Sequence, residues 1–224
     1  MDALIFDFDG VIVDSEPIHL MGFQRVLAEA GVDMTEADYY GRYLGFDDHD
    51  CFEAVSRDKG AGFTADRIRR MTAAKTAIVK EALGRSAQAL PGAVALIRAA
   101  AEAGVPLAIC SGALRDEIAL ASAAVGVGEA FEVVIAAEDV DRGKPDPQGY
   151  RRAVEALCER LARPIAPPRC VVVEDSPAGI SAAKAAGTAV LGVTTSYPAA
   201  ALAEADRITA SLADVTLASL AELL

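Results

Sequence analysis

The chain has 224 residues, which is enough for one large domain or for a core domain with a smaller inserted one. Its composition, 53% hydrophobic and 24% charged, is that of a globular protein that can bury a sizeable core. The formal net charge of −12 favours solubility and disfavours binding to nucleic acid or to an anionic membrane, and no local cluster of lysine and arginine offsets it.

Short apolar runs alternate with helical patterns along the chain. Most of these runs lack polar alternation, which is typical of strands in a parallel sheet that is covered on both faces. They span residues 3–8, 105–110, 133–136, 170–173 and 188–193. Because strand and helix alternate repeatedly, the sequence predicts an α/β fold with a doubly wound, Rossmann-like parallel sheet.

The stretch between the first two predicted strands is far longer than a single crossover needs. It reads as helical, with no clear strand, from about residue 15 to residue 84. The helical signals are an apolar face at Phe23, Val26, Leu27 and Ala30, and two further segments at 48–57 and 64–83. We therefore expect an all-α cap of residues 15–84, inserted into an α/β core of residues 1–14 and 85–224.

Three helices of the predicted core have readable ends. Pro91-Gly92 precedes an alanine-rich helix that stops at Gly104. Asp146-Pro147 opens a second helix, and Ser176-Pro177 opens a third that Gly187 closes. A polar N-cap followed by proline, and a glycine after the last turn, are typical helix boundaries.

Polar residues follow four of the predicted strands at their carboxyl ends, where open α/β sheets bind ligands. They are Asp7, Asp9 and Gly10 after the first, Ser111 and Gly112 after the second, Lys144 beyond the third, and Glu174 and Asp175 after the fourth. Acids crowded at one edge repel one another unless a cation is present. Mg²⁺ takes oxygen ligands from one or two carboxylates plus a substrate phosphate, so the set predicts a Mg²⁺ site.

The same residues meet the needs of phosphoryl transfer. Lys144 and Mg²⁺ can neutralise phosphate charge, and Ser111 and the amides near Gly10 and Gly112 can donate hydrogen bonds to phosphate oxygens. Asp7 can attack phosphorus to form an aspartyl-phosphate. Asp9 can protonate the leaving alkoxide and later deprotonate the hydrolytic water.

These residues resemble the four motifs of the haloacid dehalogenase superfamily, in order and over essentially the whole chain. The motifs are DFDGVIVDSE at residues 7–16, Ser111, Lys144 in GKPDP, and EDSPAG at residues 174–179. The helical insert is similar to the cap of the β-phosphoglucomutase and phosphoglycolate phosphatase-like branch. The dehalogenases of the superfamily lack the second acid of the first motif, so Asp9 favours a phosphate ester as substrate.

The resemblance implies a role for each matching residue. Asp7 would be the nucleophile and Asp9 the general acid and base. Mg²⁺ would be held by Asp7, the backbone carbonyl of Asp9 and Asp175, with Glu174 in the outer shell of the metal. The cap would close over the site, exclude water and read the substrate.

Two cap residues are candidates for contact with the substrate. His19 follows the catalytic loop where the mutases also have a histidine, and the alternative is a partly exposed helix histidine. Lys75 matches loosely the place of a substrate-contacting lysine in mutase-like members. We expect His49 to be a surface residue, and Asp47, Asp48 and Asp50 to be an acidic helix start with no other role.

The acids at 47, 48 and 50 stand where β-phosphoglucomutases carry an arginine for the distal phosphate. We therefore expect a phosphatase rather than a mutase, with a sugar phosphate as first and phosphoglycolate as second candidate substrate. A phosphoryl-transferring mutase and a non-catalytic phosphate-binding regulator are the alternatives, although a binder has no need of Asp9.

The four cysteines form no Cys-x-x-Cys pair, so reduced thiols are expected rather than disulfides or a zinc site. The N-terminus lacks a basic region, and no apolar run approaches the length of a membrane span. The sequence predicts a cytoplasmic protein, a monomer or a weak homo-oligomer, whose partner is a small phosphorylated metabolite and neither nucleic acid nor membrane.

Overall fold

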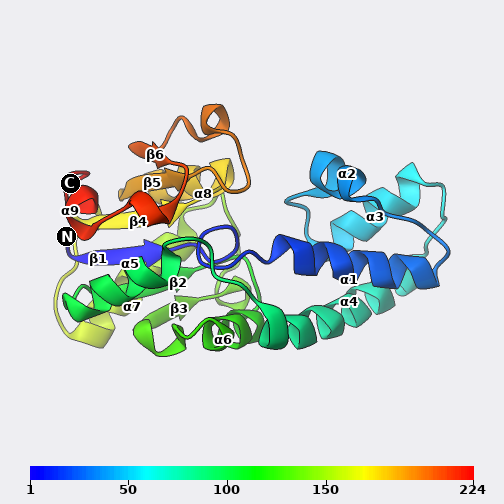
Figure 1. Ribbon diagram of the computed structural model, residues 1–224, viewed down its shortest axis with the longest axis horizontal. Helices are drawn as coiled ribbons and strands as arrows, with labels where there is room; N and C mark the ends of the chain where they lie inside the picture. The colour runs from blue at the N-terminus through cyan, green and yellow to red at the C-terminus, as the bar shows by residue number, and fades with distance from the viewer. The chain divides into compact units, whose positions relative to one another are not determined.

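The computed structural model describes all residues, 1–224. The chain forms two compact units, one of Met1–Asp14 and Ala87–Leu224 and the other of Ser15–Ser86. The elements of both units are labelled in Figure 1. None of the helices is both long enough and apolar enough to span a membrane.

The first unit is built on one six-stranded sheet in the order β3-β2-β1-β4-β5-β6, with every neighbouring pair parallel. Its strands are β1 (Ala3–Phe6), β2 (Leu107–Cys110), β3 (Val133–Ile135), β4 (Cys170–Glu174), β5 (Ala189–Val193) and β6 (Arg207–Thr209). This arrangement confirms the predicted doubly wound parallel sheet. The edge strand β6 escapes prediction because its three residues are only half-buried and two of them are polar.

Helices cover the faces of this sheet. They are α5 (Ala93–Glu102), α6 (Arg115–Ala124), α7 (Gln148–Leu161), α8 (Pro177–Ala185) and α9 (Leu217–Ala221). Short 3-10 turns lie at Gly128–Ala130, Ala137–Asp139, Pro167–Arg169, Ala199–Leu202 and Leu212–Asp214. Helix α6 has no recognisable start signal, because the side chain of the preceding residue, Leu114, makes no capping bond.

The helices predicted to begin near Pro91, Asp146 and Ser176 are present in the structure, and local contacts explain where each of them begins. Ser176 caps α8 by accepting a hydrogen bond from the amide of Gly179 at 3.0 Å. Asp146 accepts from the amide of Gln148 at 2.9 Å at the start of α7. Gly92, which precedes α5, has φ +85°, and a Cβ there would lie 2.1 Å from the backbone nitrogen of Ala213. Only glycine fits that position.

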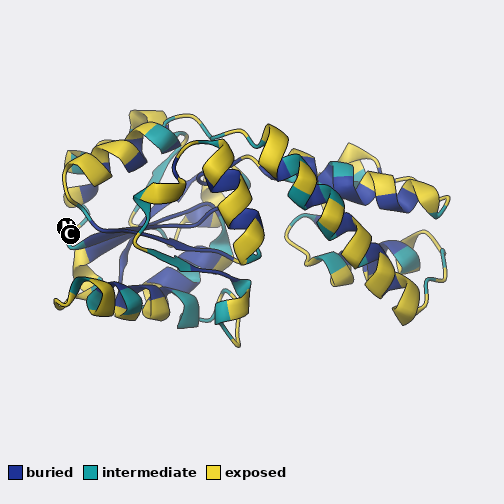
Figure 2. Cartoon of the chain, turned by 90° about the horizontal axis from the view of Figure 1, so that it is seen from below, coloured by how far each residue is buried: buried dark blue, intermediate teal, exposed yellow.

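The core of this unit lies between the sheet and the helices. Figure 2 shows the central strands as buried, and the covering helices as buried on one face and exposed on the other. Ile5 pairs in register with Ala108 on one side and with Val172 on the other, and all three are fully buried. The carboxyl ends of β1, β2 and β4 are therefore rigidly placed side by side.

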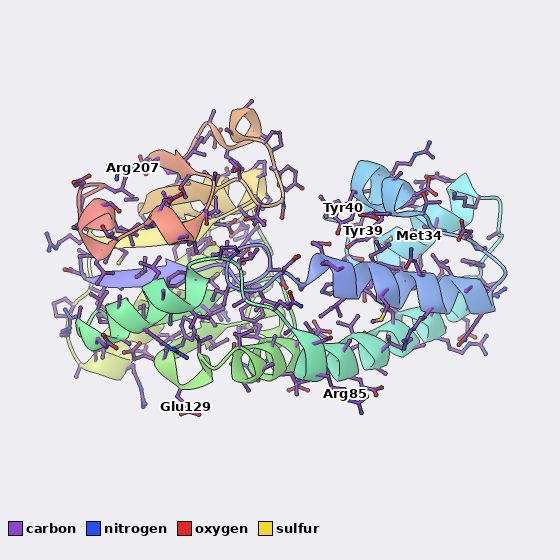
Figure 3. The ribbon with its side chains drawn as sticks, in the orientation of Figure 1. Met34, Tyr39, Tyr40, Arg85, Glu129 and Arg207 are labelled. Atoms are coloured by element: carbon purple, nitrogen blue, oxygen red, sulfur yellow. The ribbon has the colours of Figure 1, made fainter.

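The second unit is helical and contains no strand. Its elements are α1 (Glu16–Glu29), α2 (Glu36–Asp38), a π-helical segment (Tyr39–Tyr43), α3 (Asp48–Asp58) and α4 (Ala65–Ser86). Helices α1 and α3 both contact α4. The core of the unit includes Phe23, Phe52, Met34 and Tyr39, and the last two are labelled in Figure 3.

Candidate active site

The loop after β1 is a tight turn that fixes Asp7 and the residues that follow it. The Asp7 amide donates to the Val173 carbonyl at 2.9 Å, so this residue still belongs to the β1–β4 ladder. The amides of Ile12 and Val13 then converge on the carbonyl of Phe8, at 2.8 and 3.2 Å. The Asp7 carboxylate is thereby held on the sheet, while the chain turns back immediately behind it.

Gly10 lets this turn approach the end of β4. Its φ is +73°, and a Cβ added there would lie 2.0 Å from Oδ2 of Asp175. No side chain fits in that space, so the turn requires glycine for both its backbone conformation and its close contact. The two predicted metal ligands from β1 and β4 are in this way brought to one place.

Lys144 connects the acids of the two strands. Its ammonium donates to Oδ1 of Asp7 at 2.6 Å and to Oε1 of Glu174 at 2.5 Å. The side chain of Glu174 is fully buried, and those of Asp7 and Lys144 are 11% and 18% exposed. A lysine from the loop after β3 thus forms ion pairs with carboxylates from the ends of β1 and β4.

The carboxylate of Glu174 accepts all of its hydrogen bonds from groups of the protein. Five donors reach its carboxylate: Lys144 Nζ, the Tyr150 hydroxyl, the amides of Asp175 and Ser176, and the Ser176 hydroxyl. A Cβ at Gly179 would lie 1.7 Å from Oε1 of Glu174, so the start of α8 also approaches this carboxylate closely. Glu174 is therefore better suited to orient Lys144 than to bind a ligand directly.

The carboxylates of Asp7, Glu174 and Asp175 form the acidic cluster. One oxygen of each lies within 4.8 Å of the others, and all three residues are buried. Asp9, on the turn, is close enough for its charge to raise the pKa of Asp175. The spacing and the all-oxygen donor set could hold a divalent cation.

Burial raises the pKa values of two of these acids. The pKa of Asp7 lies well above its ordinary value because the group is desolvated, and Glu174 and Asp175 raise it further, while Lys144 opposes the shift. Burial also raises the pKa of Asp175, to about 7. Burial alone would lower the pKa of Lys144, but the carboxylates of Asp7 and Glu174 raise it. One lysine therefore does not suffice to keep all of these buried carboxylates ionised.

Ser111 and Gly112 lie on the loop between β2 and α6. Ser111 is buried, its amide donates to the Ile135 carbonyl at 2.9 Å, and its hydroxyl accepts from the Ala113 amide at 3.0 Å. Ser111, Gly112 and Lys144 line one pocket of about 230 Å³ at the ends of β2 and β3. The predicted phosphate-binding residues of this loop therefore share a pocket with the lysine.

Sequence reasoning missed two residues that contact the cluster. The buried hydroxyl of Tyr150 donates to Oε1 of Glu174 at 2.6 Å. Ser196 donates its hydroxyl to Oδ2 of Asp175. A signal existed for Ser196, because it lies just beyond the fifth predicted strand, at the same edge of the sheet as the other site residues.

His19 and Lys75 contact each other inside the helical unit. Lys75 is 1% exposed, and its ammonium lies 2.8 Å from Nδ1 of His19 and 4.1 Å from the centre of the Phe23 ring. It also forms an ion pair with Asp48. Because an ammonium can only donate, Nδ1 of His19 accepts and its proton lies on Nε2. Burial and the charge of Lys75 lower the pKa of His19 to about 3, so the ring is neutral.

This arrangement corrects the expectation that Asp48 belongs only to an acidic helix start. Asp47 does fill that role, because its carboxylate caps α3 by accepting from the amide of Asp50 at 2.8 Å. Asp48 instead neutralises a buried lysine from α4. The sequence could not show this pair, because 27 residues separate its members.

Comparisons with known proteins agree with the motifs. A family model described as haloacid dehalogenase-like hydrolase matches residues 1–187. Validoxylamine A 7'-phosphate phosphatase from Streptomyces hygroscopicus subsp. limoneus is 33% identical, and the match covers 94% of both chains. Hexitol phosphatase A from Escherichia coli K12 is 33% identical over 96% of this chain and 93% of its own.

A solved structure extends the likeness to the fold. A mutant of CbbY from Rhodobacter sphaeroides, in complex with xylulose-(1,5)bisphosphate, superposes with a TM-score of 0.85 at 26% identity, covering 98% of this chain and 99% of that one. The resemblance found in the four motifs is thus confirmed. The chain belongs to the haloacid dehalogenase-like hydrolases and is an enzyme of the phosphoric monoester hydrolase class.

Proposed function

We propose that the protein is a Mg²⁺-dependent phosphatase of a sugar phosphate that works through an aspartyl-phosphate on Asp7. The observation that carries the proposal is the acidic cluster: three buried carboxylates with oxygens within 4.8 Å of one another, paired with Lys144. This arrangement supports the proposal, because it would place a nucleophilic carboxylate beside a cation site and a lysine that can neutralise phosphate charge.

The residues present fit a magnesium ion. Asp7 and Asp175, whose pKa values are raised by burial and by neighbouring carboxylates, need a cation to stay ionised at neutral pH. Asp7 and Asp175 would hold the ion with the carbonyl of Asp9, and Glu174, already saturated with donors, would not touch it directly. When bound, Mg²⁺ would neutralise charge on the phosphate and on the attacking carboxylate.

In the proposed reaction, residues of this chain form and break each bond and transfer each proton. Asp7 attacks phosphorus as the ester P–O bond breaks, and Asp9 donates a proton to the leaving alkoxide. Asp9 next takes a proton from water, which attacks the aspartyl-phosphate, releases phosphate and restores Asp7. Lys144 neutralises phosphate charge throughout, and Ser111 and backbone amides near Gly10 and Gly112 would bind the phosphate oxygens.

The substrate class follows from the relatives and from the helical unit. By name, two of the relatives above are a phosphatase of validoxylamine A 7'-phosphate and a hexitol phosphatase. We propose that the helical unit acts as the cap, and that His19 and Lys75 contact the substrate. Asp48 neutralises Lys75, and His19 is neutral, so these three side chains together carry no surplus positive charge. They are therefore better suited to bind the hydroxyl groups of a substrate than a second phosphate group. Phosphoglycolate is the second candidate.

The first test is phosphate release from a panel of sugar monophosphates, phosphoglycolate and xylulose-1,5-bisphosphate, with Mg²⁺ and with EDTA. We expect release that requires Mg²⁺, is fastest with a sugar monophosphate and is absent in Asp7→Asn. Phosphoryl exchange between glucose 1-phosphate and glucose 6-phosphate without net release of phosphate would instead identify a mutase. Binding of phosphate without turnover of any substrate would identify a regulator.

The role of Asp9 has its own test. Asp9→Asn should lower kcat by about 10²–10⁴-fold, the usual contribution of general acid–base catalysis, with little change in substrate or Mg²⁺ affinity. A variant that keeps most of the wild-type kcat would remove Asp9 from the mechanism.

The cellular setting is also part of the proposal. All four cysteines are free, and three of them are buried. Free thiols support a reducing compartment, and we propose that the enzyme acts in the cytoplasm as a monomer or weak homo-oligomer.

A further inference from the structure

The loop that follows β5 brings a hydroxyl group to the acidic cluster. Ser196 Oγ donates to Oδ2 of Asp175, across 21 residues of sequence. Asp175 is 4% exposed, and Ser196 is half-buried. This contact joins the end of the fifth strand to a residue that follows the fourth.

The surroundings hold both groups in place. The Thr194 amide donates to the Thr209 carbonyl at 3.0 Å, which ties the start of the loop to β6. A Cβ at Gly10 would lie 2.0 Å from Oδ2 of Asp175 and 2.9 Å from Oγ of Ser196. The hydrogen bond is therefore enclosed by the turn after β1 on one side and by the β5 loop on the other.

We propose that Ser196 is a positioning residue that fixes the Asp175 carboxylate for one-oxygen binding of Mg²⁺. The inference rests on the metal site of the proposed function. With Oδ2 engaged by the serine, Oδ1 is the oxygen left for a cation. Mg²⁺ requires compact octahedral coordination, whereas Ca²⁺ readily accepts a carboxylate through both oxygens. Ser196 thus contributes both affinity for Mg²⁺ and discrimination against Ca²⁺.

The experiment is calorimetric titration of the full chain with Mg²⁺ and, separately, with Ca²⁺. Ser196→Ala should raise the Kd for Mg²⁺ by about 10-fold or more, the usual cost of removing a hydrogen bond to a metal ligand. The Kd for Ca²⁺ should change less, so the preference for Mg²⁺ should fall. Ser196→Thr, which keeps the hydroxyl, should retain the wild-type preference. Thr195→Ala, at an exposed residue of the same loop, is the matched control.

The outcomes separate this inference from the proposed function. Equal Mg²⁺ affinity and selectivity in wild type and Ser196→Ala would overturn the role of Ser196 and leave the metal site standing. Loss of affinity in both Ser196→Ala and Thr195→Ala would overturn it as well, since the loop rather than the hydroxyl would then be responsible. Absence of Mg²⁺ binding in the wild-type protein would overturn the metal site, and the inference with it.

Discussion

Lys144 is the one cation within hydrogen-bonding distance of the acidic cluster, so its removal tests the electrostatics of the site directly. Lys144→Met keeps most of the side-chain volume and deletes the charge. Glu174 would keep four other donors, whereas Asp7 would lose its ion-pair partner inside the protein. Breaking a buried ion pair costs about 3–5 kcal/mol. We expect a loss at the lower end, about 3 kcal/mol in EDTA at pH 7, because Glu174 stays satisfied.

The assay is urea unfolding followed by circular dichroism, with stability obtained by linear extrapolation. Lys184→Met is the control, since Lys184 pairs with Asp206 at 2.7 Å but both side chains are more than one-third exposed. Removing that surface pair should cost no more than about 1 kcal/mol. A loss in Lys144→Met no larger than in Lys184→Met would refute the view that Asp7 depends on this lysine.

The penalty should also depend on pH. Without the lysine the pKa of Asp7 in the folded protein rises further above its ordinary value of 3.8, so the folded state binds a proton that the unfolded state does not. Because the wild-type folded state takes up this proton only at a lower pH than the variant does, the stability of Lys144→Met relative to wild type should recover as the pH falls below 7. A penalty that is unchanged at pH 5 would contradict this explanation.

Two further predictions concern other positions. Gly179→Ala places a Cβ 1.7 Å from Oε1 of the saturated Glu174 carboxylate, so it should cost about 1–3 kcal/mol in urea unfolding, whereas Gly41→Ala, where a Cβ meets nothing within 4 Å, should not show this steric cost. His19 should stay neutral in NMR titration from pH 7 to 4, because burial and Lys75 lower its pKa to about 3. Since the unfolded state then binds the extra proton, this histidine makes stability fall as the pH drops below 6.5. Lys75→Met should raise the His19 pKa, and a titration midpoint near 6.5 in the wild type would contradict the lowered pKa of this histidine.

The sequence predicted what depends on local chemistry. Buried strands read as apolar runs, and polar residues at their carboxyl ends must meet because parallel strands share one edge. Asp7, Lys144, Glu174 and Asp175 could therefore be grouped from the sequence alone, and in the folded chain these four side chains lie in contact or within a few ångströms. Their catalytic and metal-binding roles remain predictions.

What could not be predicted depends on side chains that meet across the fold. Tyr150 reaches Glu174 because α7 packs against the sheet, and Ser196 reaches Asp175 because the β5 loop folds over the turn. Neither residue type suggests an acidic partner by itself. The ion pair of Asp48 with Lys75 could not be predicted from the sequence either. An aspartate in the first turn of a helix is already explained by its favourable interaction with the helix dipole, so nothing pointed to a distant partner.

The charges of the cluster also give a physical reason to expect backbone amides to take part in the proposed phosphate binding. When all three carboxylates are ionised, they and the one ammonium leave two negative charges, which a divalent cation would offset. In the proposed mechanism, a phosphate dianion would then enter a site with no surplus positive charge. Its oxygens must be stabilised by fixed dipoles, which cost no reorganisation during the reaction. Gly112 is exposed on its loop, so amides there can approach an anion closely. The amide of Gly10 instead donates to the Val13 carbonyl at 2.9 Å, and a side chain at position 10 would overlap the carboxylate of Asp175.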